Sequence, residues 1–455
     1  MDFQTLKRCG PLLLAAALCV SCASVNYRPP ADTDTMALLA KPAPAFPAVR
    51  FAVFSDPHLY DTGLGIDGKA FQDYLAADRK LIVESEEILG VAVERVKSSG
   101  AQFLLVSGDL TKDGERQDHA LFARYLGKLK DAGIPSYVIP GNHDILNPRA
   151  LSYGAAGTKG VPNVTAAEFA DIYKDFGYGS ALFRDPASLS YVAEPAPGVW
   201  LLALDSCRYA DNPNRKESET DGSFGAPTIA WIQDILARAA RQDIPVIAMM
   251  HHGVLEHYKG QSQFYAEYVV KDWQEVSALL ASYHVRLVFT GHYHAQDITA
   301  RSWDGGRFIF DCETGSLVTA PNPVRTVSID AGQQLSIDST FISQLPSYAA
   351  AGKDFHAYAE AYLRTGIEGI AIETMKGLGV PAGESVKLAP IISAAFAAHY
   401  NGDEKLSEEQ LLPTSGLSFM GGIVVANKRA LVEGLWRDLP PADNTLRVDL
   451  RTGAW

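Results

Sequence analysis

The most constraining feature of this chain is a repeated pattern in which a short apolar run is followed at once by Asp, Asn or His. Such runs have the length and composition of buried strands and occur at residues 51–54, 103–106, 137–139, 246–249 and 287–289. The polar blocks after them are Asp56-Pro57-His58, Gly108-Asp109, Gly141-Asn142-His143-Asp144, His251-His252 and Gly291-His292-Tyr293-His294. Because the carboxyl ends of neighbouring strands in an α/β sheet converge on one crevice, these polar side chains should meet in space.

The spacing of the runs also predicts the domain organisation. A Pro-rich stretch without periodicity, residues 23–48, is typical of a linker. Between residues 49 and 342, strand-like runs alternate with helical patterns such as 79–98 and 115–130, which favours an α/β domain with helices covering a sheet. Three later runs leave no room for helices and should form antiparallel additions, at 307–310, 326–329 and 335–337.

The chain changes character after Pro346. Helical patterns occur at 355–375, 386–400 and 419–438, and a possible strand follows at 445–450. We therefore expect a mainly helical C-terminal domain over residues 343–455. Its aromatic residues Phe355, Tyr358 and Tyr362 recur at helical spacing. They should pack on the preceding domain, and the alternative is that this region also overhangs the crevice and narrows it.

The N-terminal residues have the features of an export signal. Lys7 and Arg8 precede an apolar run at 11–18 that is too short to span a bilayer. The sequence Val20-Ser21-Cys22-Ala23 resembles a bacterial lipobox, in which the Cys becomes the lipidated first residue of the mature protein. We expect residues 1–22 to be a signal peptide with this lipobox-like Cys22, and the exported protein to be anchored by lipid to a membrane of the bacterial cell envelope. Cleavage without lipidation is the alternative.

Charge and cysteine content narrow the classes of function. The 455 residues include 40 Lys and Arg against 53 Asp and Glu, and the net charge of −13 repels bulk nucleic acid. An anionic substrate must therefore be captured locally. Cys207 and Cys312 follow apolar runs and are not spaced as zinc ligands, so buried free thiols are expected rather than a disulfide.

The histidines carry the metal-binding signal. Six of the eleven lie in the polar blocks, namely His58, His143, His251, His252, His292 and His294. A single D-x-H or Gly-Asp is weak evidence, because such pairs are frequent at surface turns. Core packing does not explain their joint arrangement. Oxygen and imidazole donors without thiolate predict two divalent or mixed-valence metal ions, Mn, Fe or Zn, and the sequence predicts no other cofactor.

In these blocks the chain resembles the calcineurin-like metallophosphoesterase superfamily, whose pattern is D-x-H, G-D-x-x-x-x-G, G-N-H-D/E, a strand-end His and G-H-x-H. The resemblance covers residues 49–342 and implies a four-layer α-β-β-α sandwich, followed here by the helical C-terminal region. It implies that one metal is held by Asp56, His58, Asp109 and His294. The second metal would be held by Asp109, Asn142, His251 and His292, with the Asp109 carboxylate bridging the two.

The resemblance also implies hydrolysis of a phosphate ester. Two cations about 3.5–4 Å apart neutralise the phosphoryl charge and lower the pKa of a bridging water, so that a metal-bridging hydroxide attacks. His143 would contact the substrate and act as the general acid that protonates the leaving oxygen. Asp109 and His143 are therefore the expected catalytic residues.

One position departs from the superfamily pattern. Many relatives have an Asp three residues after the bridging Asp, where it orients the catalytic His, but this chain has Lys112 there. Asp113 or Asp144 could take that role, or His143 could act without a partner. Lys112 is expected to be a solvated loop charge, and a contact with the substrate is the alternative. His252 should point away from the ligand His251 and either support the site or face the substrate.

The layout is most similar to bacterial class III cyclic nucleotide phosphodiesterases and their exported relatives with a helical C-terminal domain. This similarity depends on residues 108–111, on Asp205-Ser206 and on residues 313–316. We therefore expect the substrate to be a small phosphate ester, specifically a phosphodiester of the cyclic nucleotide type. A phosphomonoesterase or nucleotidase would need the same metals and is the alternative. A non-catalytic scaffold is a further alternative from another class.

Overall fold

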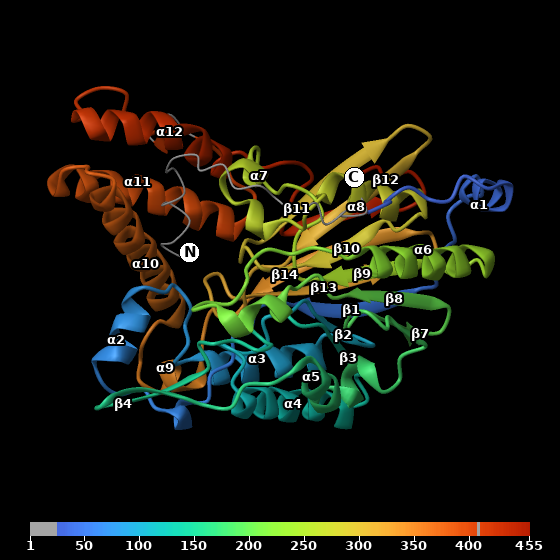
Figure 1. The fold of residues 1–455 in the computed structure, drawn as a ribbon, viewed down its shortest axis with the longest axis horizontal. Coiled ribbons are helices and arrows are strands. Elements are labelled where there is room, and N and C mark those ends of the chain that lie inside the picture. The colour runs from blue at the N-terminus through green and yellow to red at the C-terminus, as the bar shows by residue number, and fades with distance from the viewer. Residues whose placement is uncertain (1–24, 407–409) are drawn as a thin grey trace, which may run out of the picture.

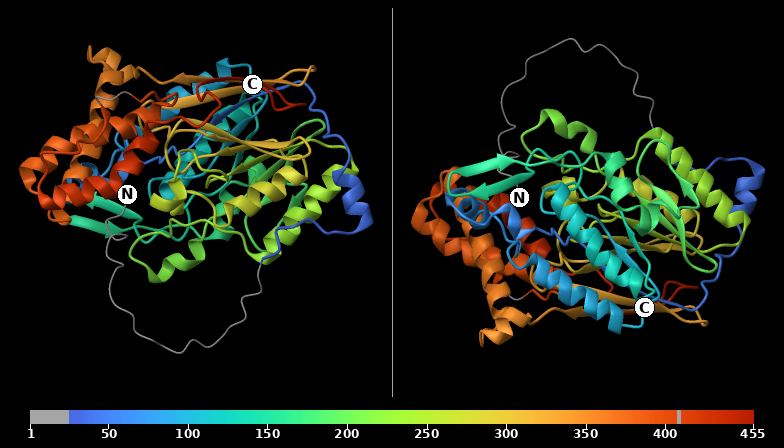
Figure 2. Two further views of the ribbon diagram at one scale, coloured as in Figure 1. Left: turned by 90° about the horizontal axis from the view of Figure 1, so that it is seen from above. Right: turned by 90° about the horizontal axis from the view of Figure 1, so that it is seen from below.

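The computed structural model describes residues 25–406 and 410–455. The expected signal peptide and Cys22 lie outside the described residues. Two large sheets form the centre of the molecule and helices cover their outer faces, which confirms the four-layer α-β-β-α arrangement (Figure 1). Further helices follow from residue 346 onward and pack at one end of the sandwich (Figures 1 and 2).

The first sheet has six strands in the order β15-β14-β13-β1-β2-β3. Their bounds are β1 Val49–Phe54, β2 Leu104–Val106, β3 Ser136–Val138, β13 Pro323–Ile329, β14 Gln334–Phe341 and β15 Thr445–Asp449. Strands β1, β2 and β3 are parallel to one another. Strand β13 is antiparallel to β1, β14 to β13, and β15 to β14. The parallel strands are almost continuously buried, as expected when helices cover one face and a second sheet covers the other.

The second sheet has seven strands in the order β11-β12-β10-β9-β8-β7-β6. Their bounds are β6 Phe183–Arg184, β7 Tyr191–Ala196, β8 Val199–Leu204, β9 Val246–Met250, β10 Leu287–Thr290, β11 Asp297–Trp303 and β12 Arg307–Glu313. The run at 307–310 was expected to be an antiparallel addition, and this is wrong for one of its two edges. Strand β12 is antiparallel to β11 but parallel to β10. In the sequence, β11 comes between β10 and β12 and runs in the opposite direction to both.

Helices lie on the outer face of each sheet. Helices α3 and α4 lie beside the first sheet, and α6 and α8 lie beside the second (Figure 1). The helices before residue 345 are α1 Thr33–Leu39, α2 Lys69–Ala76, α3 Ser85–Ser98, α4 Arg116–Asp131, α5 Ala166–Ile172, α6 Ala226–Arg241, α7 Gln261–Phe264 and α8 Trp273–Ser282. A separate hairpin consists of β4 Leu151–Gly154 and β5 Gly157–Gly160. The helix expected at 79–98 begins later, since the Leu81 N–H donates to the Val318 carbonyl (2.7 Å) and holds the preceding segment against a loop.

The core lies between the two sheets. Phe51 of β1 and Phe289 of β10 are fully buried, and their rings meet edge to face with centroids 5.4 Å apart. Such a pair adds about 0.5–1.5 kcal/mol to the stabilisation from apolar burial. Strands β1 and β10, which both lead into metal-site loops, are thus packed against each other.

The C-terminal helices are α9 Pro346–Ala350, α10 Phe355–Gly377, α11 Ala382–Asn401 and α12 Phe419–Leu435. The buried face of α10 repeats every four residues, at Phe355, Ala359, Leu363, Ile367, Ala371 and Met375. Of the three aromatic residues singled out in the sequence, Phe355 is buried, Tyr362 donates to the Leu75 carbonyl (3.3 Å), and Tyr358 is 38% exposed. After α12 the chain returns to the first sheet, where β15 pairs with β14.

Two further findings concern the membrane and the thiols. Among the described residues, none of the helices combines the length and apolar content that a bilayer crossing requires. Cys207 and Cys312 are both free thiols, as expected. Cys312 is buried, whereas Cys207 is partly exposed and its thiol donates to the Pro140 carbonyl (3.5 Å).

Candidate dinuclear metal site

All seven predicted metal ligands lie together at the carboxyl ends of five strands. Asp56 and His58 follow β1, Asp109 follows β2, Asn142 follows β3, His251 follows β9, and His292 and His294 follow β10. Each sheet therefore supplies part of the site, which lies where the two sheets face one another. These side chains are between 0% and 6% exposed.

The loops that present these residues adopt an unusual backbone conformation. Positive φ angles occur at Asp56 (50°), His58 (35°), Asp109 (49°), His292 (78°) and His294 (71°). Residues other than Gly are strained in this region, at a cost of order 1–3 kcal/mol each, and such strain is concentrated at functional sites. Bonds between the loops hold the conformation, since the Asp56 N–H donates to the Gly108 carbonyl (3.2 Å) and the His58 N–H to the Asp109 carbonyl (3.0 Å).

Two glycines allow the loops to approach this closely. A Cβ on Gly108 would lie 2.6 Å from His251 Nδ1, and a Cβ on Gly291 would lie 2.0 Å from Ser55 Oγ. Any side chain at either position would displace a ligand-bearing loop. The glycines of the Gly-Asp and Gly-His blocks are therefore required by packing around the site.

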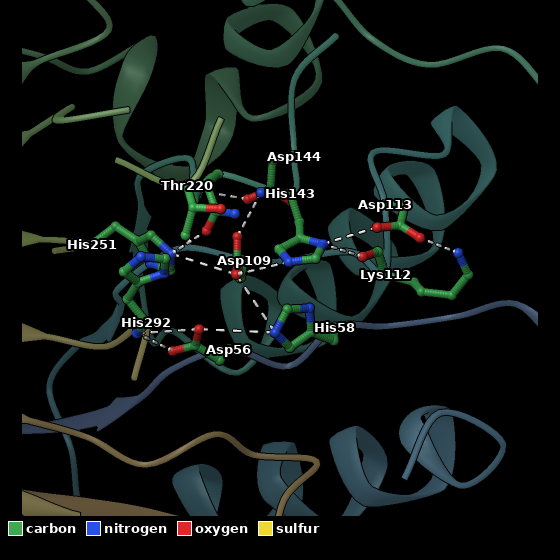
Figure 3. A network of polar contacts seen from close by, with 12 residues as sticks. Asp56, His58, Asp109, Lys112, Asp113, His143, Asp144, Thr220, His251 and His292 are labelled. Atoms are coloured by element: carbon green, nitrogen blue, oxygen red, sulfur yellow. Dashed lines mark hydrogen bonds and ion pairs between the residues drawn. The ribbon is translucent and has the colours of Figure 1, made fainter. Parts of the chain in front are cut away.

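The ligand side chains form two groups that share Asp109 (Figure 3). In the first group, His58 Nε2 lies 3.5 Å from Asp109 Oδ2 and 3.1 Å from His294 Nε2, which lies 3.5 Å from Asp56 Oδ1. In the second group, which also contains His292, His251 Nε2 lies 3.4 Å from Asp109 Oδ2 and 3.1 Å from Asn142 Oδ1. The Asp109 carboxylate thus lies between the groups, as the sequence predicts for a bridging ligand.

Backbone carbonyls fix the orientation of two of the imidazoles. His251 Nδ1 lies 2.8 Å from the Ser107 carbonyl, and His292 Nε2 lies 3.2 Å from the Glu267 carbonyl. An N–H bond on that nitrogen leaves the other ring nitrogen with a free lone pair, which is the form that binds a metal.

Burial and charge favour the protonation states of a metal site. Burial lowers the pKa of His58, His292 and His294 and so keeps these imidazoles neutral. Burial alone would raise the pKa of Asp109, but His251 and His143 outweigh it and keep the carboxylate ionised. Burial lowers the pKa of the fourth imidazole, His251, but Asp109 outweighs it and raises that pKa to about 9, so His251 releases a proton when a cation binds. Neutral imidazoles and ionised carboxylates are the species that coordinate cations, so the donor set fits two divalent metals.

His143 lies at the open side of the site. Its side chain is 25% exposed, and its Nε2 lies 4.0 Å from Asp109 Oδ2. Its Nδ1 lies 2.9 Å from Asp113 Oδ1 and 2.8 Å from the Lys112 carbonyl (Figure 3). Asp144 instead accepts from the backbone N–H groups of Leu110 (3.0 Å) and Gly141 (2.8 Å). Of the alternatives left open by the sequence, Asp113 is the residue that orients His143, and Asp144 ties two loops together.

Comparison with known proteins identifies the family. A sequence model of the family described as calcineurin-like phosphoesterase matches residues 49–296, more than half of the chain. The chain belongs to this family. It is a hydrolase that acts on phosphate esters, with two donor groups suited to two divalent metals. No curated protein matches the chain.

Solved structures with a similar fold include several hydrolases. A dimetal phosphatase from Danio rerio is 15% identical, with a TM-score of 0.45 over 65% of this chain and 97% of that one. A purple acid phosphatase from yellow lupin (Lupinus luteus) seeds is 12% identical, with a TM-score of 0.39 over 66% of this chain and 53% of that one. The sulfate thiohydrolase SoxB from Thermus thermophilus is 14% identical, with a TM-score of 0.33 over 72% and 61%. These likenesses concern the fold alone.

The expectation that Lys112 of this phosphoesterase is a solvated loop charge is wrong. Its side chain is fully buried, with the ammonium paired to Asp113 and to Glu115 Oε1 (3.0 Å). The ring of Tyr74 from α2 (4.9 Å) and the ring of Tyr153 from β4 (5.5 Å) cover the ammonium. Burial raises the pKa of Asp113, but Lys112 and His143 outweigh it and hold that pKa low. Lys112 thus keeps the carboxylate that orients His143 ionised.

His252 of the phosphoesterase supports the site without entering either ligand group. Its Nδ1 lies 2.7 Å from Ser206 Oγ and its Nε2 lies 2.9 Å from the Thr220 carbonyl. Its ring packs against His292 with centroids 4.4 Å apart. Burial lowers its pKa to about 3, so the ring is neutral and packs between the loops that carry Ser206 and Thr220.

Two basic residues beside the site, Arg79 and Lys80, were not predicted from the sequence. Lys80 is 7% exposed, with its ammonium 3.4 Å from Asp78 Oδ2. Arg79 donates through Nε to the hydroxyl of Tyr400 on α11 (2.9 Å). Burial lowers the pKa of His294 and Asp56 raises it. The charges of Arg79 and Lys80 also lower it, so both lie near the first ligand group. The only local signal was a pair of basic residues directly before an apolar segment, within a stretch assigned to a helix.

Proposed function

We propose that this phosphoesterase hydrolyses a small phosphodiester of the cyclic nucleotide type. Hydrolysis of a phosphate ester is supported by the Asp109 carboxylate, which two ligand groups share. His143 Nε2 lies 4.0 Å from Asp109 Oδ2 on the open side of the site. The choice of a cyclic diester is supported by the sequence resemblance described above. The net charge of −13 supports a small substrate captured at the metals over bulk nucleic acid.

The assignment of ligands follows the two groups. Asp56, His58, Asp109 and His294 would hold one divalent cation, and Asp109, Asn142, His251 and His292 would hold the other. When bound, two such cations neutralise the phosphoryl oxygens and lower the pKa of water. Nitrogen and oxygen donors without thiolate suit Mn, Fe or Zn.

His143 would protonate the leaving oxygen through Nε2. Its Nδ1 is held by Asp113 and by the Lys112 carbonyl, so the ring presents Nε2 toward the site. Burial lowers its pKa, but Asp109 and Asp113 outweigh this and raise it, so that a proton remains available. General-acid catalysis of this kind contributes roughly 10²–10⁴-fold.

The residues behind the cyclic nucleotide resemblance shape the loops of the site. Asp205 accepts from the Leu189 N–H (3.1 Å) and the Tyr209 hydroxyl (2.9 Å). Ser206 holds His252, and the Ser316 hydroxyl donates to the Asp56 carbonyl (2.8 Å). Their role in the proposal is thus to support the geometry common to this type of site.

One observation favours the alternative of a phosphomonoesterase or nucleotidase. Lys80 and Arg79 add positive charge beside the first ligand group, and a phosphomonoester carries one more negative charge than a diester. Under this alternative, Lys80 pairs with the additional phosphoryl charge. The two activities therefore make opposite predictions for Lys80.

The test is a substrate panel with added Mn²⁺ on wild type and on Lys80→Met. Cyclic nucleotides, linear diesters and monoesters are compared by kcat/KM. The proposal expects the highest wild-type value on a cyclic diester and an equal, small effect of Lys80→Met on all substrates. A preference for monoesters that Lys80→Met selectively removes would establish the alternative. The matched control is Lys69→Met, whose side chain is 86% exposed.

A further inference from the structure

A second cluster of Asp, His and Glu lies where the C-terminal helices meet the second sheet. Asp297 is the first residue of β11, His399 lies near the end of α11 beside it, and Glu404 follows α11 (Figure 1). Their side chains are between 0% and 1% exposed. We call these three residues the junction cluster. None of them is among the ligands assigned to the two metals above.

Their potential ligand atoms converge. His399 Nδ1 lies 2.5 Å from Glu404 Oε1 and 3.7 Å from Asp297 Oδ2, and one ligand atom from each residue lies within 4.8 Å of the others. The Asp297 and Glu404 carboxylates each have a further buried oxygen, Oδ2 and Oε2, that makes no hydrogen bond. Buried carboxylate oxygens without a hydrogen-bond donor are costly, and a cation bound to them would offset that cost.

The surroundings carry an excess of carboxylates. Burial and then the charge of Asp297 raise the pKa of Asp443 to about 10, and the same two causes raise that of Asp438 to about 7. The guanidinium of Arg325 is close enough to interact with the charges of Asp443 and Asp297, but its shortest hydrogen bonds go to backbone carbonyls. Its Nη1 donates to the Asp443 carbonyl and its Nη2 to the Glu313 carbonyl, both at 2.6 Å.

One cationic partner is already present on the other side of Asp297. His257 Nδ1 lies 2.6 Å from Asp297 Oδ1, and its Nε2 lies 3.3 Å from Asp311 Oδ2. This contact uses the Oδ1 atom of Asp297. The Oδ2 atom lies 3.7 Å from His399 Nδ1 and makes no hydrogen bond.

The backbone brings Glu404 to this position through a close approach. Gly402 has φ 73°, and a Cβ there would lie 2.3 Å from the Gln296 carbonyl. The Gln296 N–H donates to the Tyr400 carbonyl (3.3 Å). The segment after α11 is therefore held directly against the residue that precedes Asp297.

We propose that Asp297, His399 and Glu404 bind a third divalent cation, separate from the catalytic pair, that joins α11 to β11. One imidazole with two carboxylates is a donor set of Zn²⁺ or Mn²⁺, whereas Ca²⁺ sites use oxygen donors. The site is closed to substrate because its ligands are buried. Its function is to attach the C-terminal helices to the strand that follows the Gly-His-Tyr-His block.

Metal content of the full chain tests this directly. The protein is stripped with a chelator, loaded with Zn²⁺ or Mn²⁺ alone, desalted and analysed by mass spectrometry of the metal. Wild type should hold about three equivalents, Glu404→Gln about two, and Asp109→Asn about one, because buried ligand sets bind tightly enough to survive desalting. Glu360→Gln, on α10 with its side chain 40% exposed, is the matched control and should equal wild type.

Thermal unfolding adds a readout that does not depend on activity. In the Asp109→Asn background, chelator should lower the unfolding midpoint, and adding Glu404→Gln should abolish that response. Two equivalents in wild type would overturn the proposal. An Asp109→Asn protein without metal, or one with a midpoint that chelator does not change, would also overturn it even if Glu404→Gln failed to fold. An Asp109→Asn protein that has lost the catalytic pair and keeps one equivalent is the result that supports the proposal.

Discussion

The dinuclear site and the junction cluster are two buried groups of Asp and His, and the last ligand of the first, His294, is only three residues before the first member of the second, Asp297. Ligands of the dinuclear site lie on loops, and five of them have positive φ angles between 35° and 78°. In the junction cluster, Asp297 begins a strand and His399 lies in a helix. The described residues with positive φ include none of its three members.

This difference in backbone conformation distinguishes the dinuclear site, which is reactive, from the junction cluster, whose proposed role is structural. Strained loops present ligands toward an opening, where the His143 side chain remains 25% exposed, and the surrounding structure must hold that strain. The side chains of the junction cluster are at most 1% exposed and leave no room for a substrate. Similar residue types thus serve different purposes because their backbones and their access to solvent differ.

The largest expected effect distinguishes the two clusters by activity. Asp109→Asn removes the charge that both ligand groups share, so metal-supported stabilisation worth several kcal/mol is lost and kcat/KM should fall by on the order of 10³-fold or more. Glu404→Gln in the junction cluster should change kcat/KM by less than about tenfold under the same conditions. Steady-state rates with added Mn²⁺ check this. Comparable losses in the two variants would contradict the division of roles.

A smaller effect is expected for His143→Ala, which keeps the metals and removes the proton donor. Turnover of substrates with poor leaving groups should drop roughly 10²–10⁴-fold, while p-nitrophenyl esters should lose much less because their leaving group needs little protonation. The control is His356→Ala, whose side chain is 52% exposed. An equal loss on both kinds of substrate would remove His143 from the general-acid role.

The smallest effect concerns pH. Burial lowers the pKa of His143, but Asp109 and Asp113 raise it above its ordinary value, and the acid form is lost as pH rises through that pKa. Asp113→Asn removes one of the raising charges, so the alkaline limb of the kcat profile should move to lower pH. The control is Asp73→Asn, with a side chain 61% exposed. An unchanged alkaline limb would show that another group sets it.

The ligands could be predicted from the sequence because the signal is local. Each polar block directly follows its own strand, and parallel strands bring their carboxyl ends to one place. The two-sheet core was implied by the resemblance to the metallophosphoesterase superfamily, and the helices after residue 346 were predicted from their own periodicity. The prediction failed for the strand at 307–310, since the sequence does not say which neighbour lies on which side.

Contacts between distant segments could not be predicted in this way. Lys112 is buried because Tyr74 and Tyr153, far from it in the chain, cover its ammonium, and nothing near residue 112 signals this. His399 and Asp297 meet only once α11 has docked on the second sheet. From the sequence, Asp113 and Asp144 were both candidate partners of His143. The sequence could not decide between them, because the contact depends on the path of the loop.

The return of the chain to form β15 has a consequence for biogenesis. Strand β14 has β13 on one side and β15 on the other, and β15 is synthesised only after the helices α9 to α12. Until then the backbone N–H and carbonyl groups along that edge of β14 are unpaired, which makes it a template for association with other chains. A ribosome that stalls within the helices therefore releases a polypeptide with every proposed ligand of the dinuclear site and an open sheet edge.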